Sequence, residues 1–171
     1  MMPATAKDQY NEWHSRYEVD RDADTPWHRL VLAHLDLDRD LNGKRVMEIA
    51  CGRGGFAVRL MRTGIPRLVA ADFSRSAVVK GRAFAREAAM GAIRWEVADA
   101  QAICHPDASF DTVILNSVVQ YFPSADYLID VMKLALSHVT PGGRIFVTRK
   151  LVGLLVEDRA PLNAAQRHHT H

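Results

Sequence analysis

The sequence has few cysteines, few aromatic residues, no long hydrophobic run and almost no net charge. Its two cysteines, Cys51 and Cys104, are too few for a disulfide framework or a cysteine-based metal site. No segment approaches the roughly 20 consecutive apolar residues that a membrane helix requires. The formal net charge of +2 is too small to indicate nucleic-acid binding. We therefore expect neither a nucleic-acid partner nor a membrane partner.

What is present is typical of a globular domain. Hydrophobic residues make up 48% of the 171 residues and charged residues 25%, and a chain of this length can bury its own core. The first residues contain no signal-peptide pattern and the cysteines fit a reducing compartment, so we expect a cytoplasmic protein. The histidines at 168, 169 and 171 lie in a polar stretch without preorganised partners, and we expect no metal site.

Short apolar runs alternate with helical patterns along the chain. This order predicts an α/β fold, a three-layer sandwich around a mostly parallel, Rossmann-like sheet. The expected strands are 44–49, 67–71, 93–97, 110–115 and 144–148. The expected helices are 4–19, 26–35, 56–62, 74–90 and 124–139. Ser74 and Ser124 are the expected N-caps, and Gly91 and the Pro141-Gly142-Gly143 sequence are the expected stops.

The most informative stretch is residues 46–56, where an apolar run ends in a turn of small residues and a helical pattern follows. Glycine has no Cβ, so Gly52 and Gly54 allow the backbone to turn sharply and to approach a ligand closely. A second apolar run ends in Asp72, and an acid in this position can accept both hydroxyls of a ribose. Together these features predict a pocket for an adenosine-containing cofactor.

The glycine pattern alone is compatible with two cofactors. Residues 52–57 fit the fingerprint of nicotinamide dinucleotide proteins as well as a looser pattern of methyl-donor enzymes. Glu48 inside the first strand, Asp99 after the third and Asn116 after the fourth favour the methyl donor. An NAD(P)-dependent oxidoreductase remains the alternative.

This series of motifs resembles the class I S-adenosylmethionine-dependent methyltransferases over about residues 10–150. The resemblance implies that the glycine turn wraps the methionine part of the cofactor, that Asp72 binds the ribose and that Asp99 contacts the adenine. It also implies that Asn116 and Ser117 face the methyl acceptor; it assigns no catalytic residue. The full implied cofactor-binding set is Glu48, Cys51, Gly52, Gly54, Asp72, Phe73, Asp99, Ala100, Asn116 and Ser117.

Residues 115–128 resemble, more narrowly, the N-methyltransferase domains of nonribosomal peptide synthetases. The resemblance implies methyl transfer from S-adenosylmethionine to a small-molecule or peptide-like natural-product acceptor. We expect a single domain, 1–171, with a cofactor-binding core at 44–150 and a loose, polar tail at 157–171, and the broader methyltransferase resemblance implies an N-terminal helical lid at 1–36. Alignment of donor and acceptor can supply most of the rate, so His105 is only a weak candidate for a catalytic base.

The sheet of the resembled family has seven strands, and few residues follow Thr148 in this sequence. We therefore expect strands six and seven to be absent, which leaves strand 144–148 at an uncovered edge. The apolar residues 151–156 are expected to cover this edge or to pair with a second copy in a homodimer. A truncated, non-catalytic scaffold that binds the cofactor is a further alternative.

Overall fold

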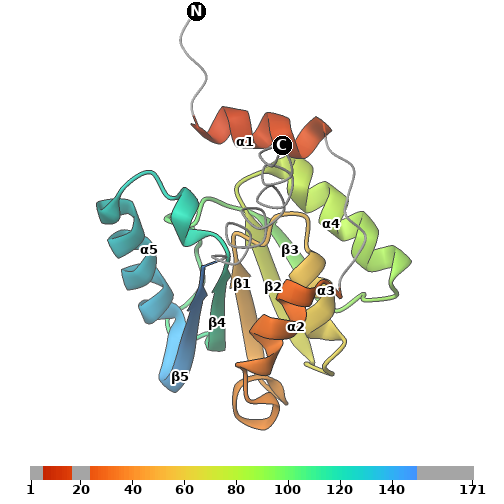
Figure 1. Ribbon diagram of the computed structural model, residues 1–171. Helices are drawn as coiled ribbons and strands as arrows, with labels where there is room; N and C mark the ends of the chain where they lie inside the picture. The colour runs from red at the N-terminus through yellow and green to blue at the C-terminus, as the bar shows by residue number, and fades with distance from the viewer. Residues whose placement is uncertain (1–5, 17–23, 150–171) are drawn as a thin grey trace, which may run out of the picture.

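A computed structural model describes residues 6–16 and 24–149 of the chain. Its centre is a parallel five-stranded sheet with the strand order β3-β2-β1-β4-β5 (Figure 1). The strands are β1 (Arg45–Ile49), β2 (Arg67–Asp72), β3 (Ile93–Val97), β4 (Phe110–Asn116) and β5 (Val139–Thr148). The helices are α1 (Ala6–Arg16), α2 (Pro26–Ala33), α3 (Gly55–Met61), α4 (Arg75–Glu87) and α5 (Ala125–His138), with a π-helical turn at Leu37–Leu41 and a 3-10 turn at Val119–Tyr121.

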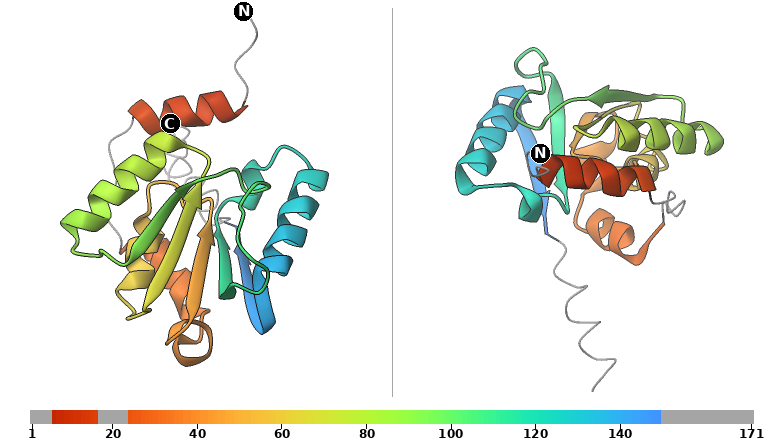
Figure 2. Two further views of the ribbon diagram at one scale, coloured as in Figure 1. Left: turned by 180° about the vertical axis from the view of Figure 1, so that it is seen from behind. Right: turned by 90° about the horizontal axis from the view of Figure 1, so that it is seen from above.

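Helices cover both faces of the sheet, which confirms the expected three-layer α/β architecture. On one face α2, α3 and α4 bury a core that includes Val46, Leu60 and Phe84. On the other face α5 packs against a core that includes Met47 and Val131, and Figure 2 shows this helix beside β4 and β5. Val46 and Met47 fall into opposite cores because successive side chains of a strand point to opposite faces.

Helix α4 ends earlier than the sequence predicts, and glycine does not end it. Ala89 adopts a left-handed conformation with φ +57°. The N–H groups of Ala89 and Met90 donate to the carbonyls of Arg86 and Ala85 at 3.0 and 2.8 Å. These two bonds form a Schellman closure, in which glycine usually takes the left-handed position. The predicted stop at Gly91 was therefore wrong, since an alanine already turns the chain.

Strand β5 begins at Val139 rather than at residue 144. Residues 141–143 lie inside the strand, where Gly142 has φ +81° and the register against β4 shifts. A Cβ on Gly143 would lie 2.7 Å from the carbonyl oxygen of Asp111, so the two backbones approach closely there. These residues form a bulge-like irregularity that accommodates the proline and do not stop α5, which ends at His138.

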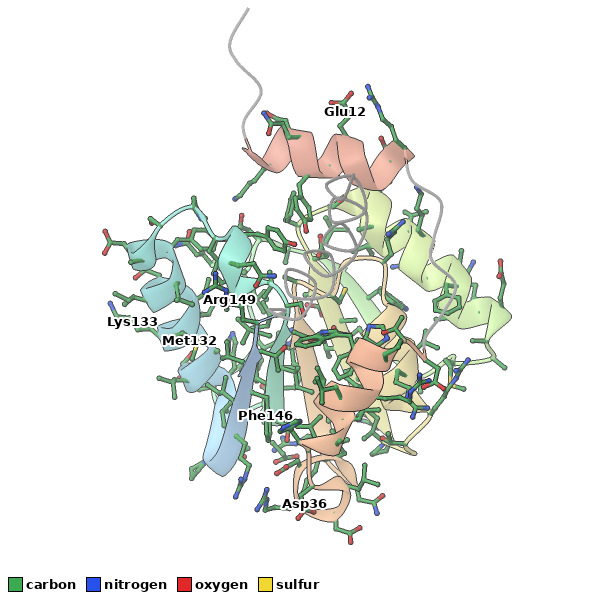
Figure 3. All side chains as sticks on the ribbon, in the orientation of Figure 1. Glu12, Asp36, Met132, Lys133, Phe146 and Arg149 are labelled. Carbon is green, nitrogen blue, oxygen red and sulfur yellow. The ribbon has the colours of Figure 1, made fainter. Side chains whose placement is uncertain are left out.

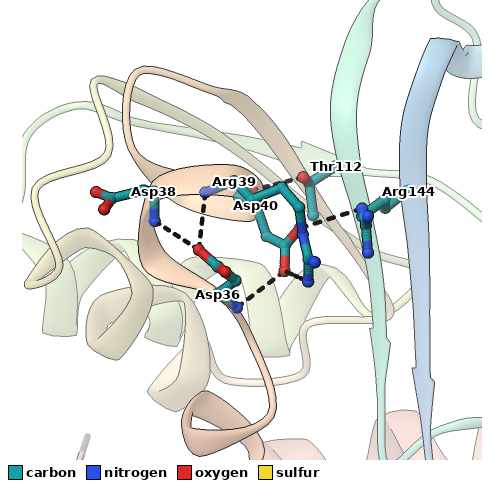
Figure 4. Close-up of polar contacts among 6 residues, drawn as sticks. All are labelled: Asp36, Asp38, Arg39, Asp40, Thr112 and Arg144. Atoms are coloured by element: carbon teal, nitrogen blue, oxygen red, sulfur yellow. Dashed lines mark hydrogen bonds and ion pairs between the residues drawn. The ribbon is translucent and has the colours of Figure 1, made fainter.

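The turn between α2 and β1 is a buried polar junction that the sequence did not predict (Figure 4). Asp40 is fully buried, and its carboxylate forms ion pairs with Arg39 and Arg144 and accepts the backbone N–H of Asp36 at 2.9 Å. Burial alone would raise the pKa of Asp40, but these partners outweigh it and lower the pKa. The backbone oxygen of Asp40 accepts the Thr112 hydroxyl at 2.6 Å, so the turn is tied to β4 and β5.

None of the helices that the structure describes combines the length and the apolar character needed to cross a bilayer. The expected edge-covering segment 151–156, the tail at 157–171 and the terminal histidines lie outside the described residues. The first predicted helix, 4–19, is described only over Ala6–Arg16.

Candidate functional site

The predicted site residues gather where the parallel strands end. Glu48 lies in β1, Asp72 ends β2 and Asn116 ends β4, and these are neighbouring strands of the sheet. Helix α1 lies across this carboxyl edge in Figure 1. In open α/β sheets the carboxyl edge is the usual place for a ligand.

Asp72 joins the ends of β1 and β2. It is 4% exposed, and its two carboxylate oxygens accept the backbone N–H groups of Gly52 and Ser74, each at 2.8 Å. Burial raises the pKa of Asp72, and these two hydrogen bonds partly offset that effect. Each carboxylate oxygen has a second lone pair, so Asp72 can hold the turn and still accept two hydroxyl groups from a ligand.

Glu48 is a buried acid with an unsatisfied oxygen. It is 2% exposed, and its Oε2 has no hydrogen-bond partner among the residues that the structure describes. Burial, together with the nearby Asp72, raises the pKa of Glu48 to about 8. At neutral pH the side chain is therefore held as a neutral acid, available to a hydrogen-bond donor or a cation.

The turn after β1 uses left-handed backbone at Ala50, Gly52 and Gly54, with φ values of +57°, +53° and +76°. The N–H of Cys51 donates to the carbonyl of Ala71 at 2.9 Å, which joins the turn to β2. Burial raises the pKa of the Cys51 thiol, so the thiol remains neutral and unreactive. The absence of a Cβ at Gly54 leaves room for the indole of Trp95.

Asp99 lies just after β3 and is held by two side chains. Lys7 of α1 and the hydroxyl of Tyr127 on α5 both donate to its carboxylate. Burial alone would raise the pKa of Asp99, but these hydrogen bonds outweigh it and lower the pKa. The next residue, Ala100, is 7% exposed and belongs to the core beneath α5.

Helix α1 contacts the site through several side chains besides Lys7. The Tyr10 ring lies 6.1 Å from the Phe73 ring and 5.5 Å from the Tyr121 ring, between centroids. The Ser74 hydroxyl donates to the side-chain oxygen of Asn11 at 2.6 Å. Burial raises the pKa of Tyr10 to about 12, so its hydroxyl stays protonated. Glu12 points away from the sheet in Figure 3.

At the end of β4, Asn116 is fixed by donors from two other elements. Its Oδ1 accepts the indole N–H of Trp27 at 3.1 Å and the hydroxyl of Thr148 at 2.8 Å. Ser117 follows in a left-handed conformation with φ +57°, and its N–H donates to the backbone oxygen of Thr148 at 3.1 Å. Sequence reasoning missed Thr148 and the Trp27 indole as partners, because no local pattern joins residues so far apart.

A hollow of about 570 Å³ opens at the opposite, amino edge of the sheet, and its lining includes Arg45, Arg94 and His105. Arg45 pairs with Asp111, and Arg94 and His105 both pair with Glu96. Arg45 and Arg94 are thus each paired with an acid. His105 lies at the amino ends of the strands, so it cannot serve as a base at the carboxyl edge. No group of three or more potential metal ligands occurs among residues 6–16 and 24–149.

Comparison with known proteins agrees with this geometry. A family model described as "Methyltransferase domain" matches residues 46–143. The chain is 42% identical over 112 residues to the probable non-canonical nonribosomal peptide synthetase CymA of Salinispora arenicola, covering 61% of this chain and 1% of CymA. It is 37% identical over 110 residues to the chondramide synthase cmdD of Chondromyces crocatus, covering 61% of this chain and 3% of that protein. The chain thus spans a small part of these curated relatives.

The fold has a clear counterpart among solved structures. The Haemonchus contortus phosphoethanolamine N-methyltransferase 1, solved with phosphoethanolamine and S-adenosylhomocysteine, superposes with a TM-score of 0.71 at 22% identity. The superposition covers 84% of this chain and 31% of that one, and at this identity it supports the fold alone. The family match spans more than half of the sequence and includes the glycine turn, both strand-end acids and β4. The chain therefore belongs to the methyltransferase domain family, as its resemblance to the class I S-adenosylmethionine-dependent enzymes implied.

Proposed function

We propose that the carboxyl edge of the sheet binds S-adenosylmethionine and that the protein transfers its methyl group to a small-molecule, peptide-like acceptor. The observation that carries the proposal is the pair of buried acids, Glu48 and Asp72, beside the glycine turn. Glu48 offers an unpartnered oxygen to the ammonium group of the methionine part. Asp72 offers one free acceptor site on each carboxylate oxygen to the two ribose hydroxyls.

The remaining predicted residues fit the other parts of the cofactor. Asp99 and Ala100 follow β3 on the same edge, where they would meet the adenine, and Phe73 follows the neighbouring strand β2, where its ring would lie against the adenine. Asn116 and Ser117 end the neighbouring strand β4, where they would face the acceptor. S-adenosylmethionine supplies a methyl group on a positively charged sulfur, with a neutral thioether as the leaving group. The protein's task is then to align the acceptor and to exclude water.

A peptide-like acceptor is supported by two observations. Residues 115–128 resemble the N-methyltransferase domains of peptide synthetases, and the chain matches part of a probable nonribosomal peptide synthetase. The alternative of a nicotinamide-dependent oxidoreductase is not favoured, because the family match is to methyltransferases. A cofactor-binding scaffold without turnover is the remaining alternative, and it predicts binding of donor without methyl transfer.

We further propose that α1 is a lid over the bound cofactor. Its contacts to Phe73 and Ser74 join it to the loop that follows β2, and its contact to Asp99 joins it to the loop that follows β3. The proposal of a homodimer also rests on the edge of the sheet: β5 is the last strand in the order, and Val147 on it is 44% exposed. The segment 151–156, which would make the dimer contact, lies outside the described residues.

The central test is calorimetric titration of one preparation with S-adenosylhomocysteine and with NAD. We expect S-adenosylhomocysteine to bind and NAD not to bind. Asp72→Ala should weaken the binding by about 1.5–3 kcal/mol, the range for hydrogen bonds to a charged group. Asp107→Ala, which removes an exposed carboxylate outside the site, is the matched control and should bind as the parent does. Tight NAD binding, or unchanged affinity in Asp72→Ala, would contradict the assignment.

A second variant tests the glycine turn independently of Asp72. Gly52→Val adds a Cβ and two methyl groups at a position with φ +53°, where glycine is strongly preferred. It should abolish binding of S-adenosylhomocysteine while circular dichroism keeps most of the helical signal. An assay of the parent protein for transfer of radiolabelled methyl groups from S-adenosylmethionine to a panel of short peptides and amino acids then distinguishes an active enzyme from a scaffold.

A further inference from the structure

Trp95 of β3 lies between two glycines that are far from it in sequence. A Cβ built on Gly54 would lie 2.2 Å from the Cη2 atom of Trp95, and one built on Gly81 would lie 2.5 Å from its Cζ3 atom. Real Cβ atoms are essentially never found closer than 3.0 Å to such a neighbour. The outer edge of one indole ring therefore requires glycine both in the cofactor turn and in helix α4.

The glycine turn also lies directly against helix α4 beside this indole ring. A Cβ on Gly81 would lie 3.1 Å from the backbone oxygen of Arg53, which immediately precedes Gly54. Trp95 packs against the core beneath α3 and α4, and its partner on β2 is Ala70, which is fully buried. The small side chain of Ala70 leaves space for the large ring. The indole is thus supported by the sheet on one side and touches the turn on the other.

We propose that Trp95 is a positioning residue that holds the 52–54 turn in its binding conformation. This inference rests on the proposed function, since that turn is the one assigned to the methionine part of the cofactor. Gly54 has a left-handed φ of +76°, and its N–H donates to the carbonyl oxygen of Cys51 at 3.0 Å. Glycine adopts left-handed backbone without strain but fixes no single conformation, so the shape of the turn at Gly52 and Gly54 depends on what packs against it. Trp95 supplies that packing from behind, without touching the ligand.

The experiment combines Trp95→Phe and Gly81→Ala, singly and together. Phenylalanine lacks the outer indole atoms that reach both glycines, so the turn loses its support. We expect affinity for S-adenosylhomocysteine to fall at least about tenfold, the lower end of the loss found when the supporting partners of metal ligands are removed. Gly81→Ala should cause a similar loss by driving the indole toward the turn. In the double variant the new methyl group occupies space that the indole has left, so affinity should recover relative to either single variant.

Two controls separate positioning from general destabilisation. Val131→Ala removes buried volume on the opposite face of the sheet, and Gly91→Ala adds a methyl group where nothing lies within 4 Å. Both should bind S-adenosylhomocysteine within about threefold of the parent, because neither touches the turn. Urea unfolding of every variant shows whether a loss of affinity merely follows a loss of stability.

Amide hydrogen exchange of the unliganded protein tests the inference even if the parent binds no S-adenosylhomocysteine, which would refute the proposed function instead. We expect Trp95→Phe to speed exchange at Gly52 and Gly54 at least about tenfold relative to amides in the centre of β4, since local opening follows local support. Val131→Ala should not produce this difference. Unchanged relative exchange at the turn, or additive effects of Trp95→Phe and Gly81→Ala on affinity, would overturn the inference.

Discussion

Glu48 carries a proton in the native state at a pH where the unfolded chain has lost it. Burial, with Asp72 nearby, raises the pKa of Glu48 to about 8, and Oε2 of Glu48 has no partner among the described residues. A glutamate in an unfolded chain has a pKa of about 4.3. Between these two values the native state binds more protons than the unfolded state. The free energy of unfolding must therefore fall as the pH rises through this window.

The size of this effect follows from the shift. One pKa unit corresponds to about 1.4 kcal/mol, so the full shift from 4.5 to about 8 corresponds to about 5 kcal/mol. The penalty is absent below about pH 4, grows across the window and is complete above about pH 8. Because small domains have only about 5–15 kcal/mol of stability, the loss should be readily measured.

The assay is urea unfolding of the parent and of Glu48→Gln, followed by circular dichroism from pH 5 to pH 8. Glutamine has the shape of the protonated acid but cannot ionise, so the variant should lack this part of the pH dependence. Asp72, whose pKa is also raised, contributes to both proteins, and the difference between the two curves isolates Glu48. Glu12→Gln, which changes an exposed acid, should follow the parent. Parallel curves for the parent and Glu48→Gln would refute a buried neutral Glu48.

Three further outcomes can be checked with purified variants. Ala89→Gly should raise the free energy of unfolding by about 1 kcal/mol in urea titrations, because glycine adopts the left-handed closure of α4 without strain; an unchanged or lower value would contradict this reading. Asp40→Asn should lower it by about 1–3 kcal/mol, because the charged partner of Arg144 is lost inside the protein; full stability in this variant would show that the junction in Figure 4 is dispensable. Sedimentation should show self-association of the parent and a monomer for Leu154→Lys, whereas a parent that is monomeric at all concentrations would exclude the proposed homodimer.

Local sequence patterns were sufficient to predict most of the fold. All five predicted strands are present, because buried parallel strands have short apolar runs that differ clearly from helical periodicity. Ser74 and Ser124 cap α4 and α5 as expected, and each side chain accepts a backbone N–H three residues later. Capping depends on residues that are close in sequence, so it can be read without a structure.

One boundary that failed is set by local backbone bonds, and the other features that the sequence missed depend on contacts between distant residues. The closure at Ala89 needs only backbone bonds, and no sequence rule favours alanine there. The irregularity in β5 is set by the close approach of Gly143 to Asp111, which belongs to another strand. The polar turn around Asp40 depends on Arg144, more than 100 residues away. A short sequence window around Gly143 does not contain Asp111, and one around Asp40 does not contain Arg144.

The candidate site shows the same division between local pattern and distant contact. Glycines and strand-end acids indicated the carboxyl edge, because topology alone brings the ends of parallel strands together. The pattern could not show that Asp99 would be held by Lys7 and Tyr127, or that Trp95 would lie behind the glycine turn. The residues that receive a ligand were therefore more visible in the sequence than the residues that hold them in place.

Two left-handed residues at the strand ends show how such support works. Ala50 follows β1 and Ser117 follows β4, and each has φ +57°, a conformation that costs an L-residue about 1–2 kcal/mol. A hydrogen bond to the neighbouring strand holds each position. The N–H of Cys51, next to Ala50, donates to the carbonyl of Ala71 in β2, and the N–H of Ser117 donates to the carbonyl of Thr148 in β5. The strain persists because neighbouring strands hold both ends of the turn in register. Alanine is therefore tolerated at position 50 because the sheet holds it, and the shape of the proposed cofactor turn depends on strand pairing as much as on its glycines.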